Sequence, residues 1–220
     1  DEGPHDGIYL PGQYTGQLKI DGKPVNSYLK IFAEHQLSAL GIQHTWLTGA
    51  EWSYDHNLGE GYIYDTQLPP MPNMSLRPRK FSAIPATQEL SGFIEDHLQG
   101  KIGSHRFELA AGIRANKLLA LSNAYTELGK WFVDPRINLQ WSLPQLQLWN
   151  NPLTMAIGTG WGRTTRKPVL SQIYPDDNYW DFVQLNYYDE NPANRRVNLM
   201  TYKRASVNPA IKPAYATKRE

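Results

Sequence analysis

The sequence predicts an all-β fold, an antiparallel up-and-down meander of about nine strands. Three observations lead to this prediction: segments in which apolar and polar residues alternate, an aromatic content of 12% beside 17 glycines and 16 prolines, and connections that alternate between short and long. Aromatic side chains pack well on pleated sheets, whereas Gly and Pro end short elements. The composition and the alternation therefore favour the same fold class.

Composition also excludes several kinds of protein. With 40% hydrophobic and 20% charged residues, the chain is too apolar for intrinsic disorder. A net charge of +1 creates no overall field that would attract nucleic acid, and we expect no nucleic-acid partner. The absence of cysteine excludes disulfides, thiolate metal sites and cysteine nucleophiles. No segment has the ~18 consecutive apolar residues of a membrane-spanning helix, which leaves spanning by strands open.

Three segments alternate cleanly between apolar and polar positions: residues 105–114, 137–143 and 153–161. In the last of them the second face carries only small residues, such as Gly158 and Gly160. A period of two is typical of a strand with one apolar face. The predicted apolar face consists of Phe107, Leu109, Ile113, Ile137, Leu139, Trp141, Leu143, Leu153, Met155 and Ile157.

Six further segments suit strands although their alternation is interrupted: residues 13–21, 25–34, 41–54, 89–98, 179–188 and 195–203. The predicted strands average roughly ten residues, longer than the ~5–6 typical of soluble sheets. Between 110 and 129 several leucines also permit a short helix, so a strand ending near Arg114 has a helical alternative after it.

The connections between these strands sort by length. Those at 35–40, 99–104, 144–152 and 189–194 are the shorter ones, and those at 55–88, 115–135 and 164–178 are the longer ones. Because alternate connections of an up-and-down sheet lie at opposite ends, all the long loops are expected at one end. This arrangement is typical of a transmembrane β-barrel of the outer-membrane type. One feature disagrees, since Asp21 to Pro24 reads as a tight turn on the long-loop side.

Motifs along nearly the whole chain resemble the barrels of TonB-dependent outer-membrane receptors of the Bacteroides type. The motifs are Gly49–Trp52, Asn57–Gly61, Tyr64-Asp65 ahead of Pro69-Pro70, Arg77–Arg79, Ile84–Ala86, Leu90–Asp96, Ala111–Arg114, Val133–Leu139, and Val207–Pro213 followed by Glu220. The last motif is similar to the segment that opens a mid-barrel strand in that family.

The resemblance implies a 22-stranded barrel closed by a globular plug, which imports siderophores, cobalamin, glycans or peptides with energy from the TonB complex. Residues 1–220 are then a single mid-barrel segment, with the plug and the remaining strands absent. The implied location is the bacterial outer membrane. The implied partners are the lipid bilayer, the TonB complex through the plug, and a surface lipoprotein.

Aromatic and charged residues cluster in the long connections and suggest a ligand site. The candidate ligand-binding residues are Trp52, Tyr54, Asp55, Tyr62, Tyr64 and Asp65 around one loop, and Trp161, Arg163, Arg166, Tyr174, Asp176, Asp177 and Trp180 around another. Flat rings stack on sugars or aryl chelates, while acids and guanidiniums bind hydroxyls or carboxylates. The alternative is that the rings form the interfacial belts of an outer-membrane barrel.

No pattern in the sequence indicates catalysis, a metal or a cofactor. The six histidines lack metal-site spacing, and no nucleophile elbow or catalytic carboxylate pair is recognisable. Asp176, Asp177 and Asp181 suit a solvated loop better than a calcium site, because the turn-forming glycine of a calcium loop is missing. The Gly158, Gly160 and Gly162 repeat lies in a predicted strand, where a phosphate loop would need a following helix. We therefore predict that the chain is not an enzyme.

Two other interpretations remain open. One is a secreted or surface-anchored, glycan-binding β-sandwich, in which the apolar face packs against a second sheet. The other is a small, free-standing outer-membrane barrel of eight to ten strands. Alternation alone does not choose among them, because it establishes only that one face is apolar.

Overall fold

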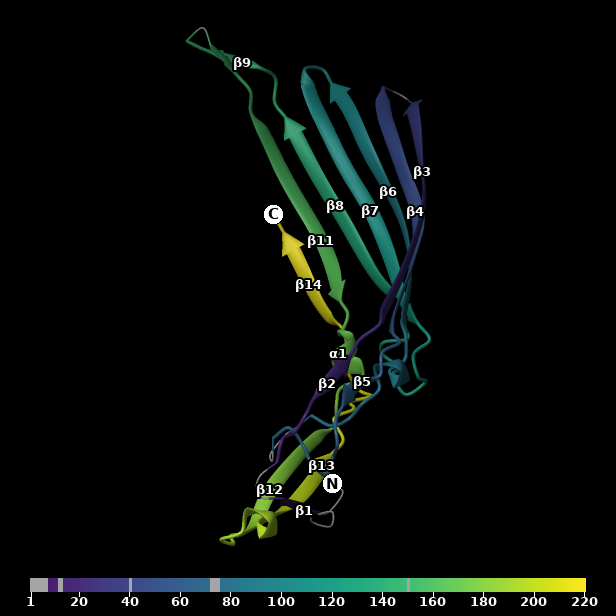
Figure 1. The fold of residues 1–220 in the computed structure, drawn as a ribbon. Helices are drawn as coiled ribbons and strands as arrows, with labels where there is room; N and C mark the ends of the chain where they lie inside the picture. The colour runs from purple at the N-terminus through teal and green to yellow at the C-terminus, as the bar shows by residue number, and fades with distance from the viewer. Residues whose placement is uncertain (1–7, 12–13, 40, 72–75, 150) are drawn as a thin grey trace. The chain divides into compact units, whose positions relative to one another are not determined.

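The computed structural model describes residues 8–11, 14–39, 41–71, 76–149 and 151–220. Within these residues the regular structure is almost entirely β (Figure 1). The strands are β1 Ile8–Pro11, β2 Lys19–Asp21, β3 Pro24–Ala39, β4 Ile42–Asn57, β5 Gly61–Ile63, β6 Thr87–Ile102, β7 His105–Leu119, β8 Phe132–Ser142, β9 Leu146–Leu148, β10 Asn151–Leu153, β11 Ala156–Arg166, β12 Asn178–Tyr187, β13 Arg196–Arg204 and β14 Ala214–Arg219. One α-helical turn, α1 Leu170–Ile173, and two 3-10 turns, η1 Phe81–Ala83 and η2 Pro192–Asn194, complete the regular elements.

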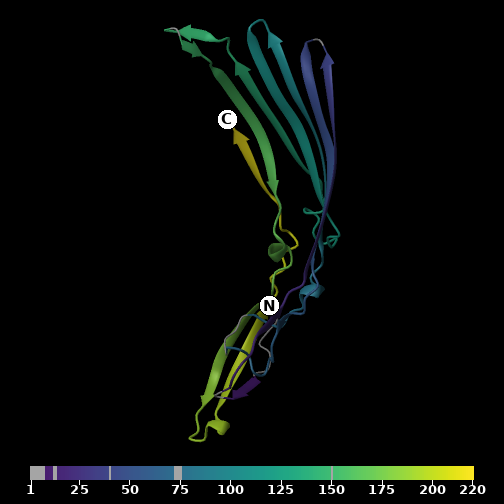
Figure 2. The ribbon, with the colours of Figure 1, turned by 45° about the horizontal axis from the view of Figure 1, so that its top comes forward.

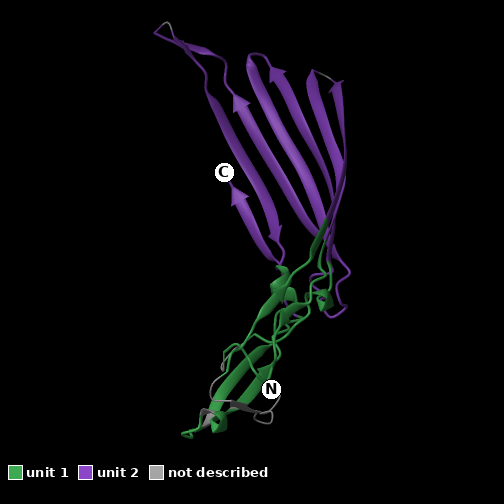
Figure 3. Cartoon of the chain, viewed as in Figure 1, with its two compact units in different colours: residues 1–26, 55–86, 169–209 green, residues 27–54, 87–168, 210–220 purple. Residues whose placement is uncertain are grey.

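The chain divides into two compact units (Figure 3). Unit 1 comprises residues 1–26, 55–86 and 169–209, and unit 2 comprises residues 27–54, 87–168 and 210–220. The division separates the long strands from most of the longer connections, and each unit is described by itself below.

Unit 2 is built on a seven-stranded sheet in the order β14-β11-β8-β7-β6-β4-β3. Six of these strands, from β3 to β11, follow one another in the sheet in the same order as in the chain, and both ribbon views show them side by side (Figures 1 and 2). They overlap with the predicted segments 25–34, 41–54, 89–98, 105–114, 137–143 and 153–161, although the strand of the last segment begins only at Ala156. The all-β prediction and the meander are confirmed for this part of the chain.

The register of the central strands follows from the alternation in their sequences. Phe107 pairs with Trp141, and Leu109 pairs with Leu139. Ile157 in turn pairs with the same Trp141 from the other side. Directly paired residues share a face of a sheet, so the predicted apolar positions of β7, β8 and β11 form one continuous surface.

Most large side chains of this apolar face are exposed. Ile113, Ile137 and Leu139 keep 45%, 44% and 40% of their surface, and Ile31 and Ile157 keep 66% and 57%. Sandwich sheets bury such a face against a second sheet. Among the described residues of unit 2 the sheet has no such partner layer.

The seven-stranded sheet is curled. A single hollow of about 880 Å³ is lined by Lys30 of β3 and also by Thr217 and Lys218 of β14, the two edge strands. A flat sheet would hold its edges far apart, so the common hollow requires curvature. Within the described residues each edge strand is paired on one side only.

Connections alternate between the two ends of this sheet as predicted. The segments between β4 and β6, between β7 and β8, and between β11 and β14 leave from one end. The short turns after β3 and β6 and the connection from β8 to β11 lie at the other end. The alternation of ends is therefore confirmed for the strands of this sheet. The sorting by length fails at one connection, because residues 143–155, between β8 and β11, are no fewer than residues 120–131, between β7 and β8.

Two predicted meander strands belong elsewhere. β12 and β13, predicted as 179–188 and 195–203, form a hairpin in a three-stranded sheet of order β1-β13-β12 in unit 1. The prediction that they continue the meander is wrong, because β11 pairs instead with β14, from Trp161 opposite Arg219 to Arg166 opposite Ala214. The hairpin is thus part of one long connection between β11 and β14.

The predicted strand 13–21 also leaves the meander. Only Lys19–Asp21 is a strand, and it pairs with Gly61–Ile63 in a two-stranded sheet of unit 1, while residue 13 lies outside the described residues. Asp21 reinforces this pairing because its side chain accepts a hydrogen bond from the Glu60 amide at 2.9 Å. The tight turn from Asp21 to Pro24 therefore joins a strand of another sheet to β3, and its disagreement with the loop pattern disappears.

The segment after Arg114 forms strand rather than helix. β7 runs on to Leu119 because Ala115 and Asn116 pair with Val133 and Phe132. The following turns fold back as a small core in which Leu118, Tyr125, Leu128 and Phe132 are buried. The leucines that suggested a helix thus include the core residues of the loop.

Candidate functional site

Charged side chains gather on the second, inner face of the seven-stranded sheet. Glu51 of β4 accepts a hydrogen bond from Arg114 of β7 and forms an ion pair with Lys30 of β3 at 3.3 Å. Glu95 of β6 binds Arg136 of β8 in the same manner. These carboxylates are nearly buried, with 13% and 11% of their side-chain surface exposed, so each has a cationic partner where solvent is scarce.

Amide and hydroxyl groups extend this network along the sheet. Asn116 accepts hydrogen bonds from Ser91 at 2.9 Å and from Arg114 at 3.0 Å, and donates to Asp134 at 3.3 Å. Asp134 also accepts a hydrogen bond from Thr165 of β11 at 2.6 Å. The network therefore connects β3, β4, β6, β7, β8 and β11. A polar network of this extent helps to specify the strand register, because each group finds its partner in only one register.

Glycines on β11 keep the inner face open. Gly158, Gly160 and Gly162 lie opposite Gln140, Asn138 and Arg136 of β8. A Cβ at position 160 would stand 2.5 Å from the side-chain oxygen of Asn138. The prediction that this glycine repeat lies in a strand is confirmed, and here glycine makes room for long polar neighbours.

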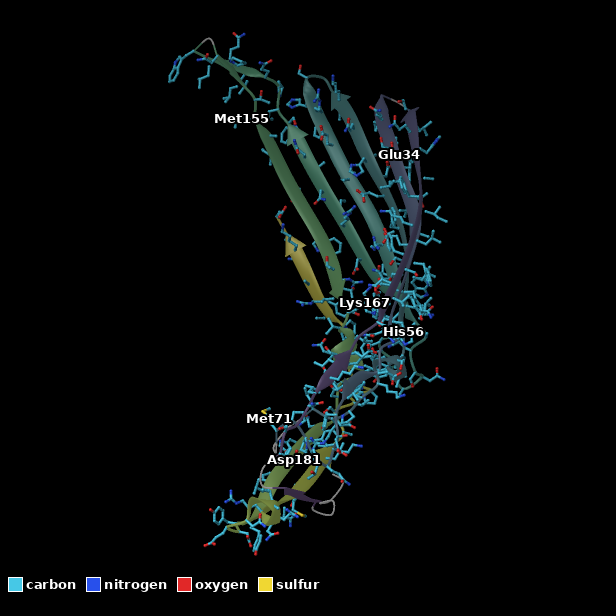
Figure 4. The ribbon with its side chains drawn as sticks, in the orientation of Figure 1. Glu34, His56, Met71, Met155, Lys167 and Asp181 are labelled. Carbon is cyan, nitrogen blue, oxygen red and sulfur yellow. The ribbon has the colours of Figure 1, made fainter. Side chains whose placement is uncertain are left out.

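Unit 1 contains a second polar cluster, centred on the Arg77 side chain. Arg77 donates a hydrogen bond to Asp181 of β12 at 2.5 Å and lies 4.7 Å above the centre of the Tyr179 ring. Thr201 of β13 donates to the same Asp181 oxygen at 2.6 Å. Only 4% of the Asp181 side chain is exposed, and Figure 4 labels this residue on the β12–β13 hairpin. The cluster fastens the segment 76–79 to one face of the β12–β13 hairpin.

Arg79 and Tyr64 strengthen the same attachment. Arg79 pairs with Asp176 and donates to the Tyr174 carbonyl at 3.1 Å. The Tyr64 hydroxyl donates to the Leu76 carbonyl at 2.6 Å. Residues far apart in the sequence are therefore held together by guanidinium groups, which bind carboxylates and carbonyls with directed hydrogen bonds.

Burial and charge alter two pKa values in this cluster. Burial raises the pKa of the Tyr64 phenol above its ordinary value, which keeps the hydroxyl protonated as a donor. Burial would lower the pKa of Arg77, but its hydrogen bond and ion pair with Asp181 outweigh that effect and raise it. Both groups thus keep the protonated form that the attachment requires.

The other face of the β12–β13 hairpin exposes an aromatic platform, which we define as Trp180, Phe182 and Tyr202. Trp180 pairs directly with Tyr202 across the hairpin, and the Phe182 and Tyr202 rings meet edge to face at 5.5 Å. Their exposed fractions are 46%, 51% and 37%. Three rings on one side of a hairpin offer a surface on which a flat or sugar-like ligand can stack.

The predicted ligand-binding residues fall into two groups. Asp55, Tyr62, Tyr64, Asp65, Tyr174, Asp176, Asp177 and Trp180 all lie in unit 1. Within it, Tyr64 lies beside the Arg77 cluster, Asp176 pairs with Arg79, and Asp177 pairs with Lys203 at 3.4 Å. Several of these residues therefore support the loop structure instead of facing an open site.

The remaining candidates, Trp52, Tyr54, Trp161, Arg163 and Arg166, lie on strands of unit 2. The Trp52 and Tyr54 rings stack at 6.2 Å near the end of β4. The Arg163 guanidinium binds the Val133 carbonyl and stands 5.5 Å from the centre of the Tyr215 ring. Trp161 and Arg163 also line the hollow of the curled sheet.

The inner-face network and two of the three platform residues, Phe182 and Tyr202, were not identified from the sequence. Glu51, Glu95, Arg114 and Arg136 occupy polar positions of alternating strands, but which acid meets which base depends on a register that spacing does not give. Phe182 is two residues from Trp180, and Tyr202 lies opposite Trp180, so all three share one face of the hairpin. Pairing of the predicted strands 179–188 and 195–203 could have indicated this.

Among the described residues no group of three His, Cys, Asp or Glu side chains lies close enough to hold a metal ion. None of the helices that the structure describes is long and apolar enough to cross a membrane. Comparison with known proteins found no matching family model, no matching curated protein and no matching solved structure.

Proposed function

We propose that the chain is a barrel segment of a TonB-dependent outer-membrane receptor that takes up a nutrient. The main observation in favour is the contrast between the two faces of the curled seven-stranded sheet: one is apolar and exposed, and the other carries the ionic network. Outer-membrane barrels are apolar toward lipid and polar toward the lumen. The motifs that resemble such receptors add independent support.

The aromatic residues at the two ends of the apolar face fit the thickness of a membrane. At the end of the sheet that carries the short turns, the Phe107 and Trp141 rings stack with their centroids 6.0 Å apart. At the end that carries the long loops, the Lys117 ammonium lies 5.8 Å from the centre of the Trp131 ring. Ten residue steps of ~3.3 Å separate Phe107 from Lys117, or ~33 Å along the strand. A tilt of about 40° reduces this to ~25 Å, the height of the apolar band in such barrels.

One polar pair on the apolar face also fits this environment. Asp96, which shares the face of Ile94, binds His44 Nδ1 at 2.8 Å. Ionisable groups within a membrane are tolerated where they pair with one another. The pair therefore does not contradict contact with lipid.

The two other interpretations receive less support. A glycan-binding sandwich needs a second layer over the apolar face, and among the described residues of unit 2 the sheet has no such layer. A small free-standing barrel needs β3 and β14 to pair with each other, and the sheet order leaves these strands at opposite edges. A large barrel, in which further strands pair with both edges, remains the best account.

Under this proposal the ligand first stacks on the aromatic platform, which belongs to the β12–β13 hairpin of unit 1. A platform of three rings suits a siderophore, cobalamin, glycan or peptide with flat or C–H surfaces. The lipid bilayer, the TonB complex and a surface lipoprotein are the partners that the proposal entails.

The test uses single cysteines, since the 220 residues contain none. Leu139→Cys and Asn138→Cys are neighbours on opposite faces of β8 and form a matched pair. In outer membranes, we expect a water-soluble maleimide to label position 138 and not position 139, while a spin label at 139 collides with oxygen dissolved in lipid. Equal aqueous labelling of both positions would refute lipid contact. Shielding of position 139 from both water and lipid would favour the sandwich.

A further inference from the structure

The connection from β8 to β11 contains a small hairpin, β9–β10, at the turn end of the sheet. It projects past the neighbouring strands in the ribbon views, and Figure 4 labels Met155 at its base (Figures 1, 2 and 4). Leu148 pairs with Asn151 and Leu146 with Leu153. The other turns at this end, after β3 and β6, are short. The hairpin is therefore an addition that a simple turn between β8 and β11 would not need.

A shift in register keeps leucines on one face of this hairpin. Leu143 bonds to Met155, so three residue steps lead from there to Leu146, but only two lead from Met155 to Leu153. The additional residue changes the apolar parity from odd, in Trp141 and Leu143, to even, in Leu146 and Leu148. Leu146, Leu148 and Leu153 thus share one side, and Gln147 and Pro152 the other.

The hairpin is exposed, apolar and uncharged. Leu146 and Leu148 keep 49% and 51% of their surface, and Trp149 keeps 89%. No Asp, Glu, Lys, Arg or His occurs between Arg136 and Arg163, in a chain of which 20% is charged. A surface for a soluble protein partner would carry a polar rim with charges, whereas the lipid interface accepts leucine and tryptophan without them.

Trp149 stands in the turn with φ of +46°, a left-handed conformation. Asn, Asp and Gly adopt this conformation most readily. A tryptophan in this position costs backbone strain and holds a large ring in water. Insertion of the ring into a membrane interface would offset both costs.

We propose that β9–β10 is a membrane-interface anchor: Leu146, Leu148, Trp149 and Leu153 insert at the boundary between lipid headgroups and acyl chains, beyond the rim of the sheet. The inference rests on the proposed function, because it needs a bilayer on the apolar side of β8 and β11. It adds a lipid contact outside the spanning strands. The polar side of the hairpin, with Gln147, then faces water.

The experiment places one cysteine, carrying the fluorophore NBD, at Leu148, Gln147 or Leu139 of the full-length protein. The protein is reconstituted in phosphatidylethanolamine vesicles containing phosphatidylcholine brominated in its acyl chains. We expect brominated lipid to quench the label at 148 while iodide does not, and the reverse at 147. A second label at Leu146 repeats the test if the 148 variant fails to fold.

Each alternative result has a distinct meaning. Quenching of position 148 by iodide, as at 147, would show the hairpin in water and overturn the anchor. Protection of 148 from both quenchers would indicate a protein partner and also overturn it. Position 139 separates the two proposals: if lipid reaches 139 but not 148, only the anchor fails, and if lipid reaches neither, the proposed function fails first.

Discussion

Gly49 of β4 lies directly beneath the ring of Phe93 of β6. A Cβ at position 49 would stand 2.7 Å from the Phe93 ring and 2.6 Å from the Ile31 carbonyl oxygen of β3. Because the Ile31 oxygen is backbone of a paired strand, Gly49→Ala must displace β3 as well as the Phe93 ring. The glycine therefore permits the close approach of three strands, and the aromatic ring covers the gap that it leaves.

Gly49→Ala is expected to destabilise the folded protein by about 1–3 kcal/mol, the usual cost of overpacking. Gly92→Ala is the matched control, since its Cβ would meet only the Gly49 carbonyl, at 3.9 Å. Urea unfolding of the two variants in the same vesicles measures the difference. Equal midpoints would mean that β3 adjusts without cost.

Leu139→Arg is expected to reduce the free energy of unfolding in bilayers by about 2–4 kcal/mol, because it places a charge in the lipid. Asn138→Arg, one residue away on the inner face, should be tolerated. Unfolding titrations in vesicles, with assembly in outer membranes as a second readout, test both variants. If both are equally harmful, the sheet has a packed layer on each side.

Arg77→Ala is expected to loosen the β12–β13 hairpin by about 3 kcal/mol, because it leaves the buried Asp181 carboxylate without its cation. Lys80→Ala is the control, since its ion pair with Glu60 is exposed and worth little. Limited proteolysis within residues 178–204 reports the loosening. Unchanged cleavage in Arg77→Ala would show that segment 76–79 does not restrain the hairpin.

The raised pKa of Tyr64 predicts a dependence of stability on pH. A group whose pKa is higher in the folded state contributes stability that is complete below its unfolded pKa of ~10 and is lost as pH rises through the folded value. Tyr64→Phe should therefore remove part of the stability change above pH 10. The tyrosinate absorbance of the unmodified protein minus that of the variant should titrate above pH 10, and a lower midpoint would contradict the structure.

Substitutions in the aromatic platform are expected to weaken capture of the ligand. A good aromatic stack contributes roughly 0.5–1.5 kcal/mol beyond buried area, so Trp180→Ala combined with Tyr202→Ala should weaken capture of the growth-supporting ligand about tenfold. Tyr188→Ala is the control, since this exposed ring stacks on Arg195 outside the platform. Uptake at equal surface expression is the measurement. Unchanged uptake would remove the ligand site from the hairpin.

Much of the fold was predictable because alternation is a local property. The apolar surface that includes Leu109 and Leu139 was predicted from the period of two alone. The end of the sheet at which each connection lies was predicted by counting the strands. The placement of β12 was not predictable in this way, since whether β11 pairs with 179–188 or with Ala214–Arg219 depends on contacts distant in sequence. For the site, ring content drew attention to Trp180, whose ring is exposed, but it did not reveal that Tyr64 and Asp176 hold the loops in place.

The neighbourhood of β11 and β14 also has a consequence for the order of folding. From β3 to β11 the strands of the seven-stranded sheet pair in the order in which they occur in the chain, but residues 167–213 separate β11 from β14. Closing so long a segment costs more entropy than forming the two-residue turn after β6. We therefore expect β14 to pair with β11 late in folding, and until it does the edge of β11 is open to pairing with another chain.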